Sequence, residues 1–146
     1  MCIVKGVILR KAQVKDKKGI RTLLKSSKLQ TWYLDDNLDN FVVAYQREFV
    51  GCGCLCLHDG VFELRGLCVR SSFRGKGFGS KLFKFLMKKA VGKKVSQVFV
   101  RLENKKLVSF YEQFGFKTIA KSQCPIKTKM PGINVLPMKL FLKNKQ

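Results

Sequence analysis

Glycines alternate with basic residues in one short stretch of the chain, Arg74-Gly75-Lys76-Gly77-Phe78-Gly79-Ser80. Glycine adopts backbone conformations that other residues avoid, so several backbone N–H groups can converge on one ligand here. An amphipathic helix predicted to follow adds free N–H groups and the positive end of its dipole. The stretch predicts a site for phosphate oxygens, to which Arg74, Lys76 and Lys81 add positive charge.

Two familiar phosphate-binding patterns do not fit this stretch. A Walker A loop places Ser or Thr directly after its lysine, whereas Lys76 is followed by Gly77. The dinucleotide pattern Gly-x-Gly-x-x-Gly, counted from Gly75, has Ser80 in its last position. On its own, the loop therefore predicts anion binding and no particular ligand.

The cysteines and the one histidine indicate no metal site. Cys52, Cys54 and Cys56 alternate along a strand-like run, so their side chains share a face at about 7 Å spacing, which does not suit chelation of one metal. We interpret them as small core residues, and the six cysteines as free thiols in a reducing compartment. His58 lies in the turn-like sequence His58-Asp59-Gly60, a poor position for a metal ligand or a catalytic base.

The elements that must position the loop follow from hydrophobic periodicity. We expect helices over 14–24, 81–91 and 105–114, with Asp16 as an N-cap or first-turn acid and Asn104 as an N-cap. Strands are expected over 7–10, 41–45, 49–57, 61–69, 95–102, 116–120 and 135–142. This order predicts a mixed α/β protein whose first half is largely antiparallel.

Length and composition set further limits. With 146 residues, 46% of them hydrophobic, the chain suits a single domain, which we place at residues 7–142 with a short basic tail at 143–146. Runs long enough for a membrane span or a secretory signal are missing, so we expect a cytoplasmic protein, monomeric or homodimeric. A net charge of +21 attracts anions, which makes nucleic acid or the ribosome a candidate partner.

Two motifs together resemble the GNAT superfamily of acetyl-CoA-dependent N-acetyltransferases. Residues Arg74 to Gly79 fit its Arg/Gln-x-x-Gly-x-Gly/Ala signature, and Asn104 with Phe110-Tyr111-Glu112-Gln113-Phe114-Gly115-Phe116 is similar to its second motif. The opening Leu9-Arg10-Lys11-Ala12 with Asp16 also looks like the start of such domains. The resemblance runs from Val7 to Leu142. It implies a six- to seven-stranded, mostly antiparallel sheet flanked by about four helices.

The resemblance also implies how acetyl-CoA is bound, as a co-substrate and without a metal. The pyrophosphate would lie on the amides of Gly75, Lys76, Gly77, Phe78, Gly79 and Ser80 beside Arg74, and the pantetheine arm would pair with Leu67, Cys68 and Val69. Gly66 marks either a bulge that exposes backbone N–H groups or a packing contact. Asn104 would contact the cofactor, cap its helix, or do both.

Two residues are candidates for acid–base catalysis in the implied reaction, in which an amine attacks the thioester. Glu63 matches the position of a catalytic glutamate in some relatives and would be the general base; alternatively it pairs with Arg65 or another cation. Tyr111 would protonate the departing thiolate, because its phenol pKa near 10 exceeds that of a thiol. Alternatively, Tyr111 anchors its helix in the core.

The acceptor amine is left open by conflicting cues. Trp32, Tyr33, Asp35 and Asp36 would suit a cationic acceptor, or form an exposed polar turn. Lys127 and Lys129, in the loop expected at 121–134, would suit an acidic one. Small amines, amino acids, polyamines and protein amines all fit. The alternative to an enzyme is a basic adaptor that binds nucleic acid or the ribosome and keeps a vestigial acetyl-CoA site.

Overall fold

The computed structural model describes residues 2–4, 6–58, 61–93, 96–126 and 136–142. The expected Asp59-Gly60 turn, the loop lysines Lys127 and Lys129, and the basic tail at 143–146 lie outside these residues. The chain divides into two compact units, the first made of Met1–Cys56 and Arg65–Lys89 and the second of Leu57–Leu64 and Ala90–Gln146. The assignment of residues 7–142 to one domain stays a prediction.

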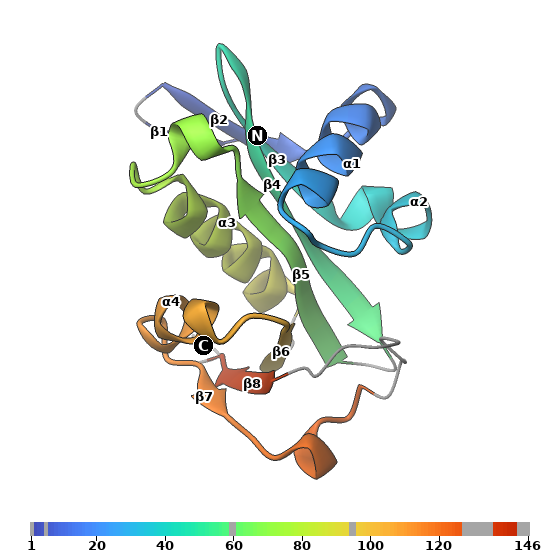
Figure 1. Ribbon diagram of the computed structural model, residues 1–146, viewed down its shortest axis with the longest axis vertical. Coiled ribbons are helices and arrows are strands. Elements are labelled where there is room, and N and C mark those ends of the chain that lie inside the picture. The colour runs from blue at the N-terminus through green and yellow to red at the C-terminus, as the bar shows by residue number, and fades with distance from the viewer. Residues whose placement is uncertain (1, 5, 59–60, 94–95, 127–135, 143–146) are drawn as a thin grey trace. The chain divides into compact units, whose positions relative to one another are not determined.

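The first unit is built on a run of neighbouring strands in the order β1-β2-β3-β4-β5 (Figure 1). These strands are β1 (Cys2–Val4), β2 (Val7–Lys11), β3 (Phe41–Gln46), most of β4 (Glu48–His58) and the later part of β5 (Val61–Val69). The pairs β1–β2, β2–β3 and β3–β4 are antiparallel. The expected hairpin is confirmed: β3 and β4 are joined at Arg47, whose φ is +66°.

Three helices belong wholly or mainly to the first unit: α1 (Lys17–Ser26), α2 (Leu34–Asn37) and α3 (Phe78–Gly92). Helix α1 buries Ile20, Leu23 and Leu24, the spacing of one helical face, so this part of the amphipathic pattern is confirmed. Val14, expected in the same helix, lies in the 3₁₀ turn before it and is exposed. Short 3₁₀ turns occupy Val14–Asp16, Leu38–Asn40 and Ser71–Phe73.

Helix α3 begins earlier than expected, at Phe78 instead of Lys81. Its first turn closes where the Lys81 amide donates to the Gly77 carbonyl oxygen over 3.1 Å. The glycine and serine of this first turn look like loop residues in the sequence, because both have weak helix propensity. The true loop therefore shortens to Arg74–Gly77.

The second unit has strands in the order β5-β6-β8-β7. They are the first part of β5, β6 (Gln97–Leu102), β8 (Leu136–Phe141) and the two-residue β7 (Lys117–Thr118). Strands β5 and β6 run parallel, with Glu63 opposite Phe99, while β8 is antiparallel to both of its neighbours. The helix expected over 105–114 is a 3₁₀ turn, Lys105–Leu107, followed by α4 (Val108–Glu112).

This architecture confirms the predicted fold class, a mixed α/β protein with a mostly antiparallel sheet. Eight strands fall within the described residues instead of six or seven, because Cys2–Val4 adds β1. Cys52, Cys54 and Cys56 are buried in the core beside Ile20 and Phe41, as expected for small core residues. Within the described ranges, no helix is long and apolar enough to cross a membrane.

Candidate active site

The loop before α3 needs its glycines for backbone conformation. Gly75 and Gly77 have φ values of +77° and +84°, which other residues rarely adopt, while an added Cβ at either position would meet nothing within 4 Å. Both residues are exposed. The amides at the start of α3 can add donors, because the first N–H groups of a helix lack carbonyl partners within it.

Basic side chains around the loop have different tasks. Arg74 donates from Nε to the carbonyl oxygen of Val69 over 3.0 Å, which ties the loop to the end of β5. Lys76 lies over the ring of Phe73 and Lys81 over that of Phe78, at 5.8 Å and 5.2 Å from the ring centroids. The arrangement suits an anion that needs several backbone donors and nearby cations.

The end of β5 leaves regular strand geometry at Gly66, whose φ is +61°. A Cβ here would lie 2.5 Å from the hydroxyl of Tyr33 and 3.1 Å from Leu24, so Gly66 is also a close packing contact. The packing contact, one of the two alternatives for Gly66, is therefore observed, and the exposure of backbone N–H groups stays a prediction. The three residues that follow, Leu67–Val69, are half-buried.

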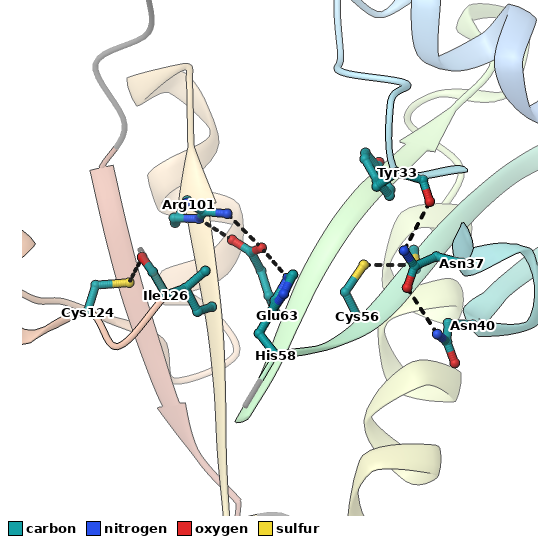
Figure 2. A network of polar contacts seen from close by, with 10 residues as sticks. Tyr33, Asn37, Asn40, Cys56, His58, Glu63, Arg101, Cys124 and Ile126 are labelled. Atoms are coloured by element: carbon teal, nitrogen blue, oxygen red, sulfur yellow. Dashed lines mark hydrogen bonds and ion pairs between the residues drawn. The ribbon is translucent and has the colours of Figure 1, made fainter. Parts of the chain in front are cut away.

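Glu63 is buried and lies at the centre of a polar cluster, which we call the Glu63 cluster: His58, Glu63 and Arg101 (Figure 2). Arg101 reaches across from β6 and donates from Nε and Nη2 to the two carboxylate oxygens, over 2.5 Å and 3.0 Å. Nε2 of His58, the last residue of β4, lies 3.2 Å from Oε1 of the same carboxylate. The pairing of Glu63 with a cation, one of the two alternatives for this residue, is thus observed with Arg101.

Tyr111 and Asn104 belong to the second unit. The ring of Tyr111 is buried on α4 and packs edge-to-face against Phe110 and Phe116, with centroids 5.1 Å and 5.4 Å away. Asn104 caps its helical segment, since its side-chain oxygen accepts from the Lys106 amide over 2.9 Å. The capping prediction for Asn104 is confirmed, and the packing of Tyr111 leaves its role in the reaction a prediction.

The four residues expected at the acceptor site have different surroundings. Trp32 is half-exposed, whereas Tyr33 is buried and stacks on Phe41. The guanidinium of Arg65 lies over both rings, 5.3 Å from the Trp32 centroid and 5.1 Å from that of Tyr33. These aromatic faces thus already serve a cation of the same chain, and burial raises the pKa of the Tyr33 phenol.

The two acids of this set are both exposed on α2. Asp35 pairs with Lys17 and with Arg21, the latter over 3.0 Å, and the hydrogen bond from Lys17 lowers the pKa of its carboxyl. Because Asp35 is paired within the chain, Asp36 is the better candidate of the two acids for contact with an acceptor.

Sequence reasoning missed Arg101, and it did not foresee that His58 lies beside Glu63. Arg101 is 38 positions from Glu63, and only the parallel pairing of β5 with β6 brings them together. His58 and Glu63 flank the expected turn, so a hairpin over 49–69 already implied that they could approach each other. This hairpin was the pattern from which their contact could have been predicted. It was not used, because His58-Asp59-Gly60 was interpreted only as a turn.

The glycine-rich loop lies at a strand-to-helix junction directly before α3, on a mixed and mostly antiparallel sheet. The sequence matches the acetyltransferase (GNAT) family over residues 9–116, which is most of the chain. The chain belongs to this family.

Solved structures share the fold at low sequence identity. A GNAT acetyltransferase from Staphylococcus aureus Mu50 superposes with a TM-score of 0.81 at 17% identity, over 94% of this chain and 99% of that one. A GNAT acetyltransferase from Elizabethkingia anophelis with acetyl-CoA bound has a TM-score of 0.74 at 19% identity, over 95% and 100% of the two chains.

A larger protein contains the same fold. N-acetylglutamate synthase from Neisseria gonorrhoeae, complexed with coenzyme A and N-acetyl-glutamate, has a TM-score of 0.83 at 21% identity over 94% of this chain. The present chain spans about a third of its length, 35%. This likeness establishes the fold.

Proposed function

We propose that the chain transfers the acetyl group of acetyl-CoA to a primary amine, by direct attack of the amine on the thioester in a ternary complex. The observation that carries the proposal is the loop Arg74–Gly77 at the start of α3. Its two glycines at positive φ, with open space where a Cβ would be, support a phosphate-binding turn. Membership of the acetyltransferase family supports acetyl-CoA as the anion.

Acetyl-CoA is proposed to lie along the residues that follow Gly66. Its pyrophosphate accepts hydrogen bonds from the amides of residues 75–80, and its pantetheine arm pairs with the backbone of Leu67, Cys68 and Val69. Gly66 supports this placement, because its positive φ interrupts the regular strand directly before them. Asn104 is proposed as a further contact.

Proton transfer is proposed to involve Tyr111 and the Glu63 cluster. An amine with a pKa near 10.4 is neutral in only about one molecule in 2,000 at pH 7, so removal of its proton limits attack. The Glu63 cluster takes up that proton. Tyr111 donates its phenol proton toward the departing thiolate, because a phenol near pKa 10 remains protonated at neutral pH.

The acceptor is proposed to be a small amine, an amino acid or an exposed protein amine. Trp32, Tyr33, Asp35 and Asp36 are proposed to border it. The N. gonorrhoeae protein, whose complex contains N-acetyl-glutamate, makes amino acids the first acceptors to test.

Titration calorimetry with acetyl-CoA at two salt concentrations tests the proposal, because a protein of charge +21 binds any polyanion at low salt. We expect one-to-one, micromolar binding that persists at the higher salt. G77D should weaken it about 100-fold, or ~2.7 kcal/mol, since it places a carboxylate beside the phosphates. G6D is the matched control, because Gly6 is also exposed, has a φ of +80° and meets nothing within 4 Å, but lies between β1 and β2.

Equal affinities of G77D and the wild type would remove the loop from the site. Binding that disappears at the higher salt would refute a shaped acetyl-CoA site and leave only attraction between a cation and polyanions. With binding established, a thiol-release assay over amino acids, polyamines and peptides identifies the acceptor. Y111F should then lower kcat about 100-fold at unchanged acetyl-CoA affinity.

A further inference from the structure

The Glu63 cluster contains a carboxylate that solvent does not reach and an imidazole that it does. The Glu63 side chain is 1% exposed and that of Arg101 5%, whereas the His58 side chain is 24% exposed. A proton that arrives from an amine or from water therefore meets the imidazole first. Figure 2 shows the Glu63 carboxylate between the two partners.

Arg101 also competes with a proton for the carboxylate of Glu63. Its guanidinium donates one hydrogen bond to each carboxylate oxygen. A carboxylate held in this bidentate way is stabilised in its ionised form, and protonation would break one of the two bonds. Glu63 is therefore a poor final acceptor of the amine proton.

The same contacts fix the tautomer of His58. An ionised carboxylate only accepts hydrogen bonds, so Nε2 of the imidazole must donate to Glu63 Oε1 across the 3.2 Å contact. The proton on Nε2 leaves Nδ1 with the ring's basic lone pair. A carboxylate that orients an imidazole, which in turn offers its other nitrogen, is the arrangement of a base with its orienting partner.

We propose that His58 is the general base of the acetyl transfer, with Nδ1 as the proton acceptor and Glu63 as the positioning residue. The ammonium form of the amine loses one proton to Nδ1, directly or through one water, and its neutral nitrogen attacks the thioester carbon as the nitrogen–carbon bond forms. The carbon–sulfur bond then breaks, and the second nitrogen proton passes to the departing thiolate, directly or by way of Tyr111. The imidazolium is stabilised by the Glu63 carboxylate, whose charge Arg101 partly balances, and it returns the proton to solvent.

This inference rests on the proposed function, and its first test does not require the acceptor. The chain has one histidine, so imidazole signals in ¹⁵N NMR belong to His58 without assignment. We expect the Nε2–H tautomer at pH 7.5, because Nε2 faces the Glu63 carboxylate. In E63Q the preference for this tautomer should weaken, because the carboxylate that accepts from Nε2 is gone. An Nδ1–H tautomer in the wild type would overturn the proposal.

The second test is kinetic and uses the amine that the thiol-release assay selects. H58Q is the informative variant, because the amide nitrogen of Gln still donates to Glu63 but carries no basic lone pair. We expect kcat/KM to fall about 100-fold in H58Q, at unchanged acetyl-CoA affinity. The decrease of kcat/KM at acidic pH should also disappear from the pH profile of this variant. E63Q should lose less, about 10-fold, because it keeps the base and weakens its orientation.

The outcomes separate the two proposals. If wild-type protein binds acetyl-CoA but acetylates none of the amines, the proposed function fails, and the role of His58 fails with it. If wild-type protein acetylates an amine while H58Q keeps its rate and pH profile, only the role of His58 is refuted. In that case a large loss in E63Q would return the base to Glu63 itself.

Discussion

Asp16 in the first unit and Glu63 in the second are both buried carboxylates bonded by an arginine at two points, yet they differ in their third partner. Arg10 donates to Asp16 over 2.7 Å and 3.0 Å, much as Arg101 does to Glu63. The third side chain on Asp16 is the phenol of Tyr45, which donates over 2.6 Å, and the backbone amide of Gln13 adds a fourth contact. On Glu63 the third partner is an imidazole.

The two clusters respond to protons in different ways. Burial alone would raise the pKa of Asp16, but hydrogen bonds from Arg10, Tyr45 and Gln13 outweigh it and lower that pKa to about 2. Burial and the bond to Asp16 raise the pKa of Tyr45. No member of the Asp16 cluster titrates near neutrality, so it fixes β2, β3 and the start of α1 together. In the Glu63 cluster the third partner is an imidazole, whose Nδ1 can accept a further proton while Nε2 stays bonded to the carboxylate.

The largest expected effect is a loss of thermal stability when the Asp16 cluster is broken. D16N leaves Arg10 without its charge partner, and breaking a buried ion pair costs about 3–5 kcal/mol. Thermal unfolding should show Tm lower by about 10 °C or more, while folded D16N binds acetyl-CoA as tightly as the wild type. A Tm within about 2 °C of the wild type would contradict the structural role of this cluster.

Acid should remove the stabilisation that the ionised Asp16 carboxylate gives to the folded protein. The folded pKa of about 2 lies below the unfolded value near 3.9, so the stabilisation is present above pH 4 and is lost as pH falls toward 2. It amounts to about 2 kcal/mol. Urea unfolding at pH 7, 4 and 2.5 should show wild type and D16N converging. A constant gap across this range would refute the assignment.

The third partners can be compared directly in Y45F and H58Q. Y45F removes a hydrogen bond to a charged group and should lower the free energy of unfolding by about 1.5–2 kcal/mol. H58Q keeps a donor to its carboxylate and should cost less than about 0.5 kcal/mol, although it removes the proposed base. Chemical denaturation of both variants checks the ranking, and a reversed order would break the comparison.

The smallest effect is expected for an exposed carboxylate with the same kind of partners. Asp35 pairs with Lys17 and Arg21, yet its side chain is 61% exposed. Solvent screens such pairs, so D35N should leave the Tm and the denaturation midpoint close to those of the wild type. A loss near that of D16N would show that burial is not what distinguishes the clusters.

Local sequence patterns predicted the features that depend on neighbouring residues. The apolar stripe of α1, the cap at Asn104 and the hairpin at Arg47 each follow from a few adjacent positions, and all three are observed. The two family motifs are local in the same sense, and they identified the family. The sequence predicted the start of α3 three residues too late, because Gly79 and Ser80 have weak helix propensity. Their place in the fold outweighs that propensity.

Features that depend on register between distant segments could not be predicted from the sequence. The partner of Glu63 is set by the parallel pairing of β5 with β6, and Asp16 meets Tyr45 only through the pairing of β2 with β3. Asp16 was expected as an N-cap or first-turn acid, and it lies in the first turn of Val14–Asp16 and at the N-cap position of α1, but its ion pair with Arg10 was not foreseen. The contact of Arg65 with the rings of Trp32 and Tyr33 was not foreseen either.

The distribution of thiols makes the chain suited to site-selective labelling. Of the five free cysteines whose side chains the structure describes, Cys52, Cys54, Cys56 and Cys124 are buried and Cys68 alone is partly exposed. The bond to Cys68 and burial also raise the pKa of Cys52, which keeps that thiol unreactive. Among these five thiols, a maleimide dye should therefore react first at Cys68, on the strand end proposed for the pantetheine arm. Such a conjugate would report ligand binding optically, without isotopes or a known acceptor.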